Sequence, residues 1–556
     1  MAASSCRDRL RTEGRRRVEA ESADAHTPLL DNQRGTQAGN RTKDTTMTRL
    51  GTLRAYYLGT VCCIGGFLFG YDSGIIGGVL TLASFQNDYR YDSDRKTFVT
   101  SLAVALQQLG AFVACFAIWP IAYRYGRRSA IAVCSLIFCI GAVIQTINTH
   151  SRPAFYVARV IAGLGLGGSS VVVPMFSSEM TPKQLRGQIG SFYQLMFTFG
   201  IFTSYWVGYG VAQNISKAET RQWQIPVGLQ LMPAALLGLG MLTLKESTRW
   251  LTSRGRHDEA WESLKWIRAD DSEETQVEME NIRAGVEYEA HAKEGFKFTG
   301  ELYIVARGLY ADVQLELVDK HNFRRTATAA AVFTAQQATG ATAFAYYGPQ
   351  YFKLLVGSKG INNLLLTAIF GAVKVAACGL FVLFVADNIN RRTVLIGGAL
   401  FMAACQISTS AMLKTHPPPE NADVTPAGIA TIALIYLFVI AYNFSWGPLP
   451  WPYVAEIFPA RVREPGIGAG VAFQWLFNFV FSLTTPYMID NMGWGTFLLW
   501  GLFDAVIAGY AWFGLIETRG KTLEEVSGPA AGGYGSGPDS INDDREVGKV
   551  PQLSLR

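Results

Sequence analysis

The chain has 556 residues, of which 49% are hydrophobic and 17% are charged, and its formal net charge is +5. An ordinary soluble protein carries roughly 25% charged residues, whereas here the charges are concentrated in Met1–Arg54, Lys245–Arg325 and Arg519–Arg556. Basic segments that flank long apolar runs are typical of membrane topology, so the positive charge does not indicate nucleic-acid binding.

Twelve apolar runs follow one another along the chain, and each is long enough to supply the about 20 residues that cross a hydrocarbon core. The first six are Ala55–Leu82, Thr97–Ala122, Ser129–Asn148, Ala154–Ser177, Gly187–Ala212 and Ile225–Leu244. The second six are Ala327–Val356, Asn363–Ala386, Thr393–Leu413, Ala427–Trp446, Gly466–Ile489 and Trp494–Ile516. The sequence therefore predicts an all-α membrane protein with twelve transmembrane helices, and the even number places both termini on one side.

The polar segments divide the chain further. We expect a disordered N-terminal tail at 1–54, a six-helix bundle at 55–244, a helical linker at 245–326, a second six-helix bundle at 327–516 and a C-terminal tail at 517–556. Lys and Arg in the short loops do not decide the orientation, because both sets of loops carry similar numbers. The basic residues of the tails and linker do decide it, and they place these parts in the cytoplasm. We expect a plasma-membrane protein.

Charged motifs recur in the two halves. The spacing of Glu179, Pro182 and Arg186 after the fourth run returns after the tenth. Such a repeat indicates a duplicated six-helix unit with the solute site at the interface. We interpret the repeated charges as a gating network that pairs across the halves and latches the outward-facing state; topology anchors, the alternative, explain the Arg but not the repeated Glu. The residues of this network are Arg127, Glu179, Arg186, Glu246, Arg249, Asp387, Arg391, Glu456, Arg463 and Glu517.

Several motifs in a fixed order carry a family resemblance. They are Gly65–Asp72, Arg159, Ser178–Gly187, Glu246–Leu251, Gln336–Gly340, Gly447–Trp451, Ala455–Pro459 and Glu517–Glu525. From Gly65 to Val526 the chain resembles the sugar porter family of the major facilitator superfamily, and within it the fungal-type monosaccharide transporters. The resemblance implies the major facilitator fold of two pseudo-symmetric halves. It also implies transport of a hexose or pentose by alternating access.

Amide and indole side chains are the expected substrate contacts. Buried hydroxyls of a solute need returned hydrogen bonds, amides both donate and accept them, and indoles offer a flat apolar face to a sugar ring. The candidates are Gln194, Gln336, Gln337, Trp451, Gln474, Trp475 and Asn478. The resemblance adds Tyr346, and of the adjacent pair Gln336 and Gln337 we expect one to face the cavity and the other to pack.

One substrate position departs from the family pattern. Sugar porters usually have Asn six residues after the first Gln of this motif, where this chain has Thr342. A hydroxyl in place of an amide weakens the assignment to a specific hexose. Nearby, the Gly- and Pro-rich segment Gly447–Pro452 cannot continue a regular helix; we interpret it as a gating hinge, and a static kink is the alternative.

Asp72 and Arg159 are the expected proton-coupling residues. Intramembrane charges are expensive and mark function, and these two could pair while Asp72 is ionised. Protonation of Asp72 would release Arg159 and let the halves move. The combination resembles that of proton symporters in the family, but some facilitators also keep an acid there, so facilitated diffusion remains an alternative.

Lys374 lies in the middle of the eighth run, and its role stays open. It could face the cavity, pair with an acid, or reach the membrane surface. A cation in the cavity would favour an anionic solute such as quinate or a sugar acid, which is the alternative substrate class.

Other classes of function are less consistent with the sequence. A sugar sensor of this fold is an alternative, although the segment after Val526 is short for one. No metal-ligand cluster, nucleophile elbow or P-loop is present, so we expect neither an enzyme nor a cofactor. The expected partners are a small sugar or polyol, a proton and the lipid bilayer, with no nucleic acid.

Overall fold

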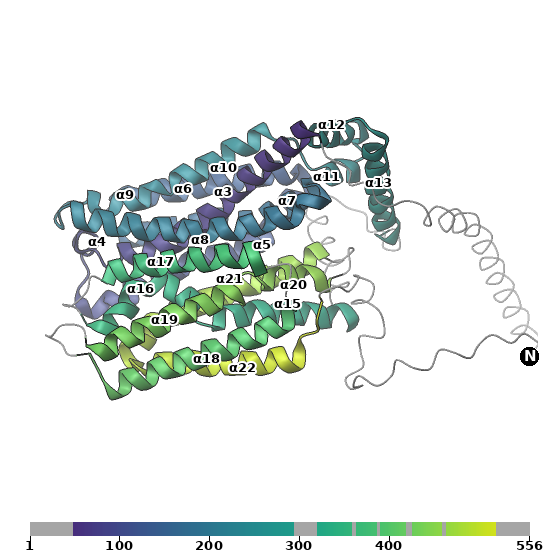
Figure 1. Cartoon of the computed structure of the whole chain (residues 1–556). Helices are drawn as coiled ribbons and strands as arrows, with labels where there is room; N and C mark the ends of the chain where they lie inside the picture. The colour runs from purple at the N-terminus through teal and green to yellow at the C-terminus, as the bar shows by residue number, and fades with distance from the viewer. Residues whose placement is uncertain are drawn as a thin grey trace, which may run out of the picture.

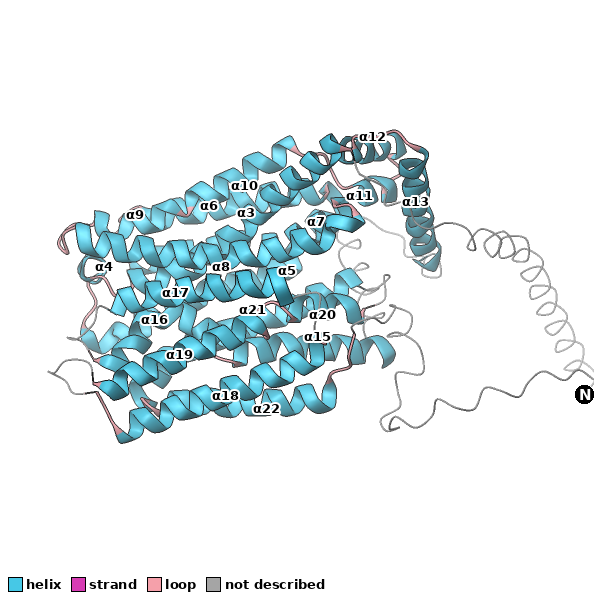
Figure 2. Ribbon diagram, viewed as in Figure 1, coloured by secondary structure: helices cyan, strands magenta, loops and turns pink. Residues whose placement is uncertain are grey.

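The computed structural model describes residues 48–293, 320–357, 363–385, 390–418, 425–458 and 463–518. Every regular element in these ranges is helical (Figure 2). The predicted tails fall almost entirely outside the described ranges. In Figure 1 the helices of the first half lie on one side of the bundle and those of the second half on the other.

The first half contains five long helices and one interrupted helix. They are α3 (Arg49–Val79), α5 (Lys96–Tyr125), α6 (Arg127–Thr146), α7 (Arg152–Met180), α8 (Lys183–Asn214), and α9 (Arg221–Leu229) followed by α10 (Leu231–Thr243). A short helix, α4 (Ala83–Tyr89), lies between α3 and α5. Six spans in this half are therefore confirmed.

The second half repeats this arrangement with more interruptions. Its helices are α15 (Lys320–Ala338), α16 (Ala341–Val356), α17 (Asn363–Leu380) with a π-helical turn at Phe381–Val385, α18 (Arg391–Thr415), α19 (Pro426–Phe444), α20 (Pro450–Ile457), α21 (Arg463–Met492) and α22 (Gly495–Gly514). Eleven helices of the described part are long and apolar enough to cross a membrane. The predicted run Ala327–Val356 supplies the remaining span as two helices, which confirms the twelve-helix fold.

The break inside this seventh span lies at Gly340. Its φ is +79°, a left-handed conformation that costs an L-residue with a Cβ about 1–2 kcal/mol. A Cβ at this position would also lie only 2.8 Å from the Trp500 ring. The sequence predicts one continuous helix here because a lone glycine in an apolar run does not reveal its backbone angles.

Glycine also sets the distance between helices of the first half. A Cβ on Gly70 of α3 would overlap the carbonyl oxygen of Phe197 in α8, and one on Gly163 of α7 would overlap that of Gln107 in α5. Small residues of this kind let helix backbones approach closely in a membrane. The Gly70 contact thus brings α3 against α8, and the Gly163 contact brings α7 against α5 beside Gln107.

Three helices of the central polar segment cap one end of the bundle, which we call the linker end. They are α11 (Thr248–Ser253), α12 (His257–Arg268) and α13 (Glu273–Lys293), visible beyond α3 and α7 in Figure 1. Arg54 Nη1 donates to the Trp266 carbonyl at 2.7 Å and Arg268 Nη1 donates to the Met180 carbonyl at 3.3 Å. The linker helices are thus attached to the first half.

Candidate functional site

An ion pair is buried at the centre of the first half. Arg159 Nη1 of α7 lies 3.4 Å from Asp72 Oδ1 of α3, and each side chain is 1% exposed. Gln107 of α5 donates from Nε2 to the other carboxylate oxygen, and Arg159 Nε donates to the Ala103 carbonyl at 2.8 Å. Three helices therefore converge on one carboxylate. The sequence identified the pair but missed Gln107, whose only signal is an amide in mid-span.

Tyr346 connects this ion pair to the second half. It lies on α16, is fully buried, and has its hydroxyl close to Ser73, the neighbour of Asp72 in α3. Asn478 Nδ2 of α21 donates to the Tyr346 hydroxyl at 3.2 Å. The structure thus places Tyr346 between Asn478 of α21 and the residue that follows Asp72 in α3.

The adjacent glutamines of α15 differ in their surroundings. Gln336 Nε2 donates to the carbonyls of Trp446 and Gly447, at 2.9 and 3.0 Å, in the segment between α19 and α20. Gln336 therefore ties α15 to this break in the tenth span. Both glutamines are 3% exposed, and within the described residues the Oε1 atoms of both have no hydrogen-bond partner, but the Gln337 side chain lacks the Nε2 bonds that anchor Gln336. Of the two amides, Gln337 is the one left available to a solute.

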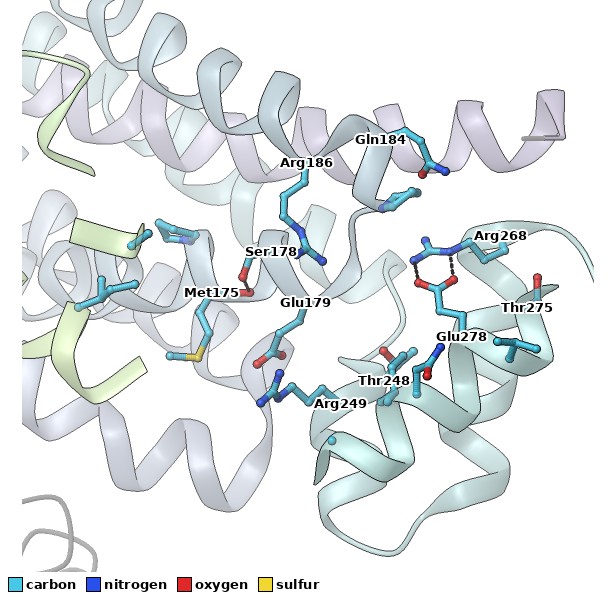
Figure 3. Close-up of a pocket in the computed structure, with 18 of the residues that line it drawn as sticks. Met175, Ser178, Glu179, Gln184, Arg186, Thr248, Arg249, Arg268, Thr275 and Glu278 are labelled. Atoms are coloured by element: carbon cyan, nitrogen blue, oxygen red, sulfur yellow. Dashed lines mark hydrogen bonds and ion pairs between the residues drawn. The ribbon is translucent and has the colours of Figure 1, made fainter. Parts of the chain in front are cut away.

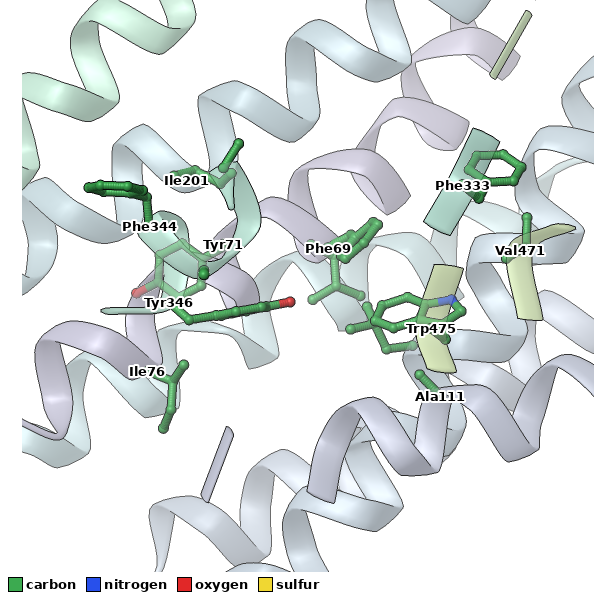
Figure 4. Close-up of a cluster of buried hydrophobic side chains, with 14 of the residues drawn as sticks. Phe69, Tyr71, Ile76, Ala111, Ile201, Phe333, Phe344, Tyr346, Val471 and Trp475 are labelled. Atoms are coloured by element: carbon green, nitrogen blue, oxygen red, sulfur yellow. The ribbon is translucent and has the colours of Figure 1, made fainter. Parts of the chain in front are cut away.

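Two of the predicted substrate residues, Trp475 and Trp451, lie at different depths in the bundle. Trp475 of α21 packs against Phe69 of α3 with ring centroids 5.0 Å apart (Figure 4), and its Nε1 donates to Ser170 Oγ of α7 at 3.1 Å. This indole joins the two halves. Trp451 of α20 packs against Phe333 at 5.0 Å and lies nearer the linker end.

A cavity of about 850 Å³ opens toward the linker end (Figure 3). Its inner wall includes Ser170, Trp451 and Val471, and its outer wall includes Arg186 and Arg249. Figure 3 shows Glu179 and Arg249 turned toward one another at the wall. Of the predicted substrate residues Trp451 lines this cavity. The others do not border it: Gln194, Gln336, Gln337, Thr342, Tyr346, Gln474, Trp475 and Asn478.

The charged motifs form matched contacts inside each half. In the first half Glu246 accepts from the backbone N–H groups of Arg127 and Arg128, at 2.9 and 3.1 Å, at the N-terminus of α6. In the second half Glu517 accepts from those of Arg391 and Arg392, both at 3.0 Å, at the N-terminus of α18. A carboxylate at a helix N-terminus is favourable in both places. The motifs that repeat in the sequence thus make equivalent contacts in the two halves.

Two ion pairs complete this network. Arg127 Nη2 lies 3.2 Å from Glu179 Oε1, and Arg391 Nη2 lies 2.7 Å from Glu456 Oε1. Each pair joins helices of one half. Asp387 and the side chain of Arg463 lie outside the described part, so pairing between halves remains a prediction.

Comparisons with known proteins identify the family of the chain. A family model described as "Sugar (and other) transporter" matches residues 58–528. A quinate permease of Emericella nidulans is 32% identical over 480 residues, which cover 85% of this chain and 88% of that protein. A probable quinate permease of Aspergillus niger is 31% identical over 481 residues, covering 85% and 87%.

Two solved structures that resemble this chain are also those of sugar transporters. The chain resembles the proton:xylose symporter XylE bound to 6-bromo-6-deoxy-D-glucose, with a TM-score of 0.69 and 26% identity over 86% of this chain and 99% of that one. It also resembles a partially occluded inward open conformation of the xylose transporter XylE from E. coli, with a TM-score of 0.68, 25% identity and coverage of 84% and 100%.

Proposed function

Because the chain belongs to the sugar transporter family, we propose that it carries a monosaccharide across the membrane by alternating access with a proton as the coupled ion. The observation that supports proton coupling is the buried pair of Asp72 and Arg159. Because Asp72 is buried, its charged form is stabilised by the Arg159 guanidinium and by the hydrogen bond from Gln107. Protonating Asp72 removes the attraction that holds α7 to α3 at this depth.

The substrate contacts proposed here are Gln194, one of the adjacent pair Gln336 and Gln337, Thr342, Tyr346, Trp451, Gln474, Trp475 and Asn478. Tyr346 supports the coupling of solute to proton, because it contacts Asn478 on one side and the neighbour of Asp72 on the other. A solute that displaces the Asn478 bond changes the position of Tyr346 and thereby the surroundings of the carboxylate.

The second candidate substrate is quinate or a sugar acid. Two observations favour it: Lys374 is buried in the second half, and the relatives above are named for quinate. Both candidates are hydroxylated rings of similar size, and the difference between them is a carboxylate.

The domain division and orientation expected from the sequence belong to this proposal. We place the linker end and both termini in the cytoplasm, in the plasma membrane. In the outward-facing state Glu179, Arg186, Arg249, Glu456 and Arg463 would pair between the halves and close the linker-end cavity.

The test is uptake by the purified full chain in proteoliposomes, with a panel of labelled xylose, glucose and quinate and an imposed pH gradient. We expect accumulation above the external concentration only when the outside is acidic. Uptake that never exceeds equilibrium under any gradient would replace symport by facilitated diffusion. Binding of sugar without flux would make the chain a sensor.

A further inference from the structure

Lys374 is a buried cation in the middle of α17. Its side chain is 4% exposed, and within the described residues no carboxylate pairs with its ammonium. Its Nζ lies 5.6 Å from the Phe197 ring and 5.8 Å from the Tyr442 ring. Cation–π contacts of this kind offset only part of the cost of a charge held at membrane depth without a counterion.

The neighbours of Lys374 place it between the two halves. Phe197 belongs to α8 of the first half and Tyr442 to α19 of the second. One turn before Lys374, a Cβ on Gly371 would lie 2.8 Å from the Tyr205 ring of α8. The α8–α17 contact is therefore a boundary that must rearrange when one half moves against the other.

The rings of Phe197 and Tyr442 connect Lys374 to the predicted substrate residues through further contacts. Phe197 packs against Phe69 at 4.8 Å, and Phe69 packs against Trp475 at 5.0 Å (Figure 4). The Tyr442 hydroxyl lies near the side chain of Thr342, the position where the family pattern has Asn. The unpaired cation and the changed side chain thus contact the same aromatic ring.

We propose that Lys374 binds the carboxylate of a hydroxylated ring solute, so that the chain accepts carboxylated polyols and sugar acids and prefers them to neutral sugars of the same size. This inference rests on the proposed transport, and it selects the second candidate substrate over the neutral monosaccharide. The solute supplies the counterion that the protein lacks: its carboxylate accepts charge-assisted hydrogen bonds from the ammonium. A neutral sugar leaves the charge unpaired.

The experiment compares glucuronate with glucose, which share a ring and differ at one carbon, and adds quinate as a second acid. Uptake is measured in proteoliposomes with wild type, Lys374→Gln and Lys374→Arg. Lys353→Gln is the matched control, because Lys353 is exposed at the end of α16. We expect Lys374→Gln to raise KM for both acids about 10-fold or more, in line with the loss of a hydrogen bond to a charged group.

The same variant should leave glucose uptake within about twofold, and Lys374→Arg should retain the preference for acids. Protection against heat by glucuronate, present in wild type and absent in Lys374→Gln, gives a readout that does not require transport. Equal effects of Lys374→Gln on glucose and on the acids would overturn the inference while leaving the proposed transport intact. Failure of wild type to take up any of the three solutes would instead defeat the proposed transport.

Discussion

Arg159 and Asp72 lie 3.4 Å apart, and each is only 1% exposed. The two side chains differ in their other hydrogen-bond partners. The carboxylate has one further donor, Gln107, whereas the guanidinium also donates to backbone. Loss of the charge on Asp72 therefore removes the ionic link between α3 and α7, while Arg159 stays bonded to α5.

The first prediction concerns Asp72→Asn. The amide cannot take up and release a proton, so concentrative uptake under a pH gradient should be abolished while counterflow exchange persists. Asp504→Asn is the matched control: Asp504 is fully buried in α22, and neither of its carboxyl oxygens has a hydrogen-bond partner within the described residues. Persistent accumulation by Asp72→Asn would exclude this carboxylate as the coupling group.

A second prediction separates the two adjacent glutamines. Gln336→Ala removes two bonds to the break between α19 and α20, so it should lower the thermal midpoint of the purified protein. Gln337→Ala should leave the midpoint unchanged and raise KM up to about 10-fold, because one neutral hydrogen bond contributes about 0.5–1.5 kcal/mol. The reverse pattern would show that Gln336 is the one that contacts the solute.

The third prediction tests the break at Gly340. Gly340→Ala should destabilise the fold by at least about 1–2 kcal/mol, because alanine is strained at positive φ and its Cβ meets Trp500. Gly397→Ala is the control in α18, where a Cβ meets no atom within 4 Å, and it should be neutral or stabilising by up to about 1 kcal/mol. Thermal unfolding in detergent measures both, and equal midpoints would contradict the assigned role of Gly340.

A fourth prediction follows from the repeated carboxylates. Glu246→Gln and Glu517→Gln each remove a charged acceptor from two backbone N–H groups, at a cost of about 1–3 kcal/mol. We expect similar decreases in thermal midpoint for the two variants, since the geometry of the two sites matches. A decrease for one variant alone would mean that the halves are not equivalent at these positions.

Hydropathy predicted the fold because a membrane leaves the backbone few choices. Unpaired N–H and C=O groups are costly in hydrocarbon, so each apolar run must be helical. The run predicted at Ser129–Asn148 is accordingly found at Arg127–Thr146. The same reasoning fails at Gly340, where the neighbouring Trp500 comes from a helix 160 residues later in the chain.

For the candidate site, the sequence predicted which residues are involved but not which residues they contact. The sequence singled out Gln336 and Gln337 together but could not say which one faces the break near Gly447. It also named Trp475 without its partner Ser170, which lies 305 residues earlier. Such pairings depend on how helices pack, and a single sequence carries little signal for them.

The contacts of Glu246 and Glu517 have a consequence for the rate of the transport cycle. Each carboxylate is bonded to backbone of its own half, so neither bond has to break when the halves change their relative position. The barrier between the inward-facing and outward-facing states then depends on contacts between the two halves, which we call the seam, such as the Trp475–Ser170 bond. Substitutions at the seam should therefore alter turnover, while those at the two carboxylates should alter the lifetime of the folded protein.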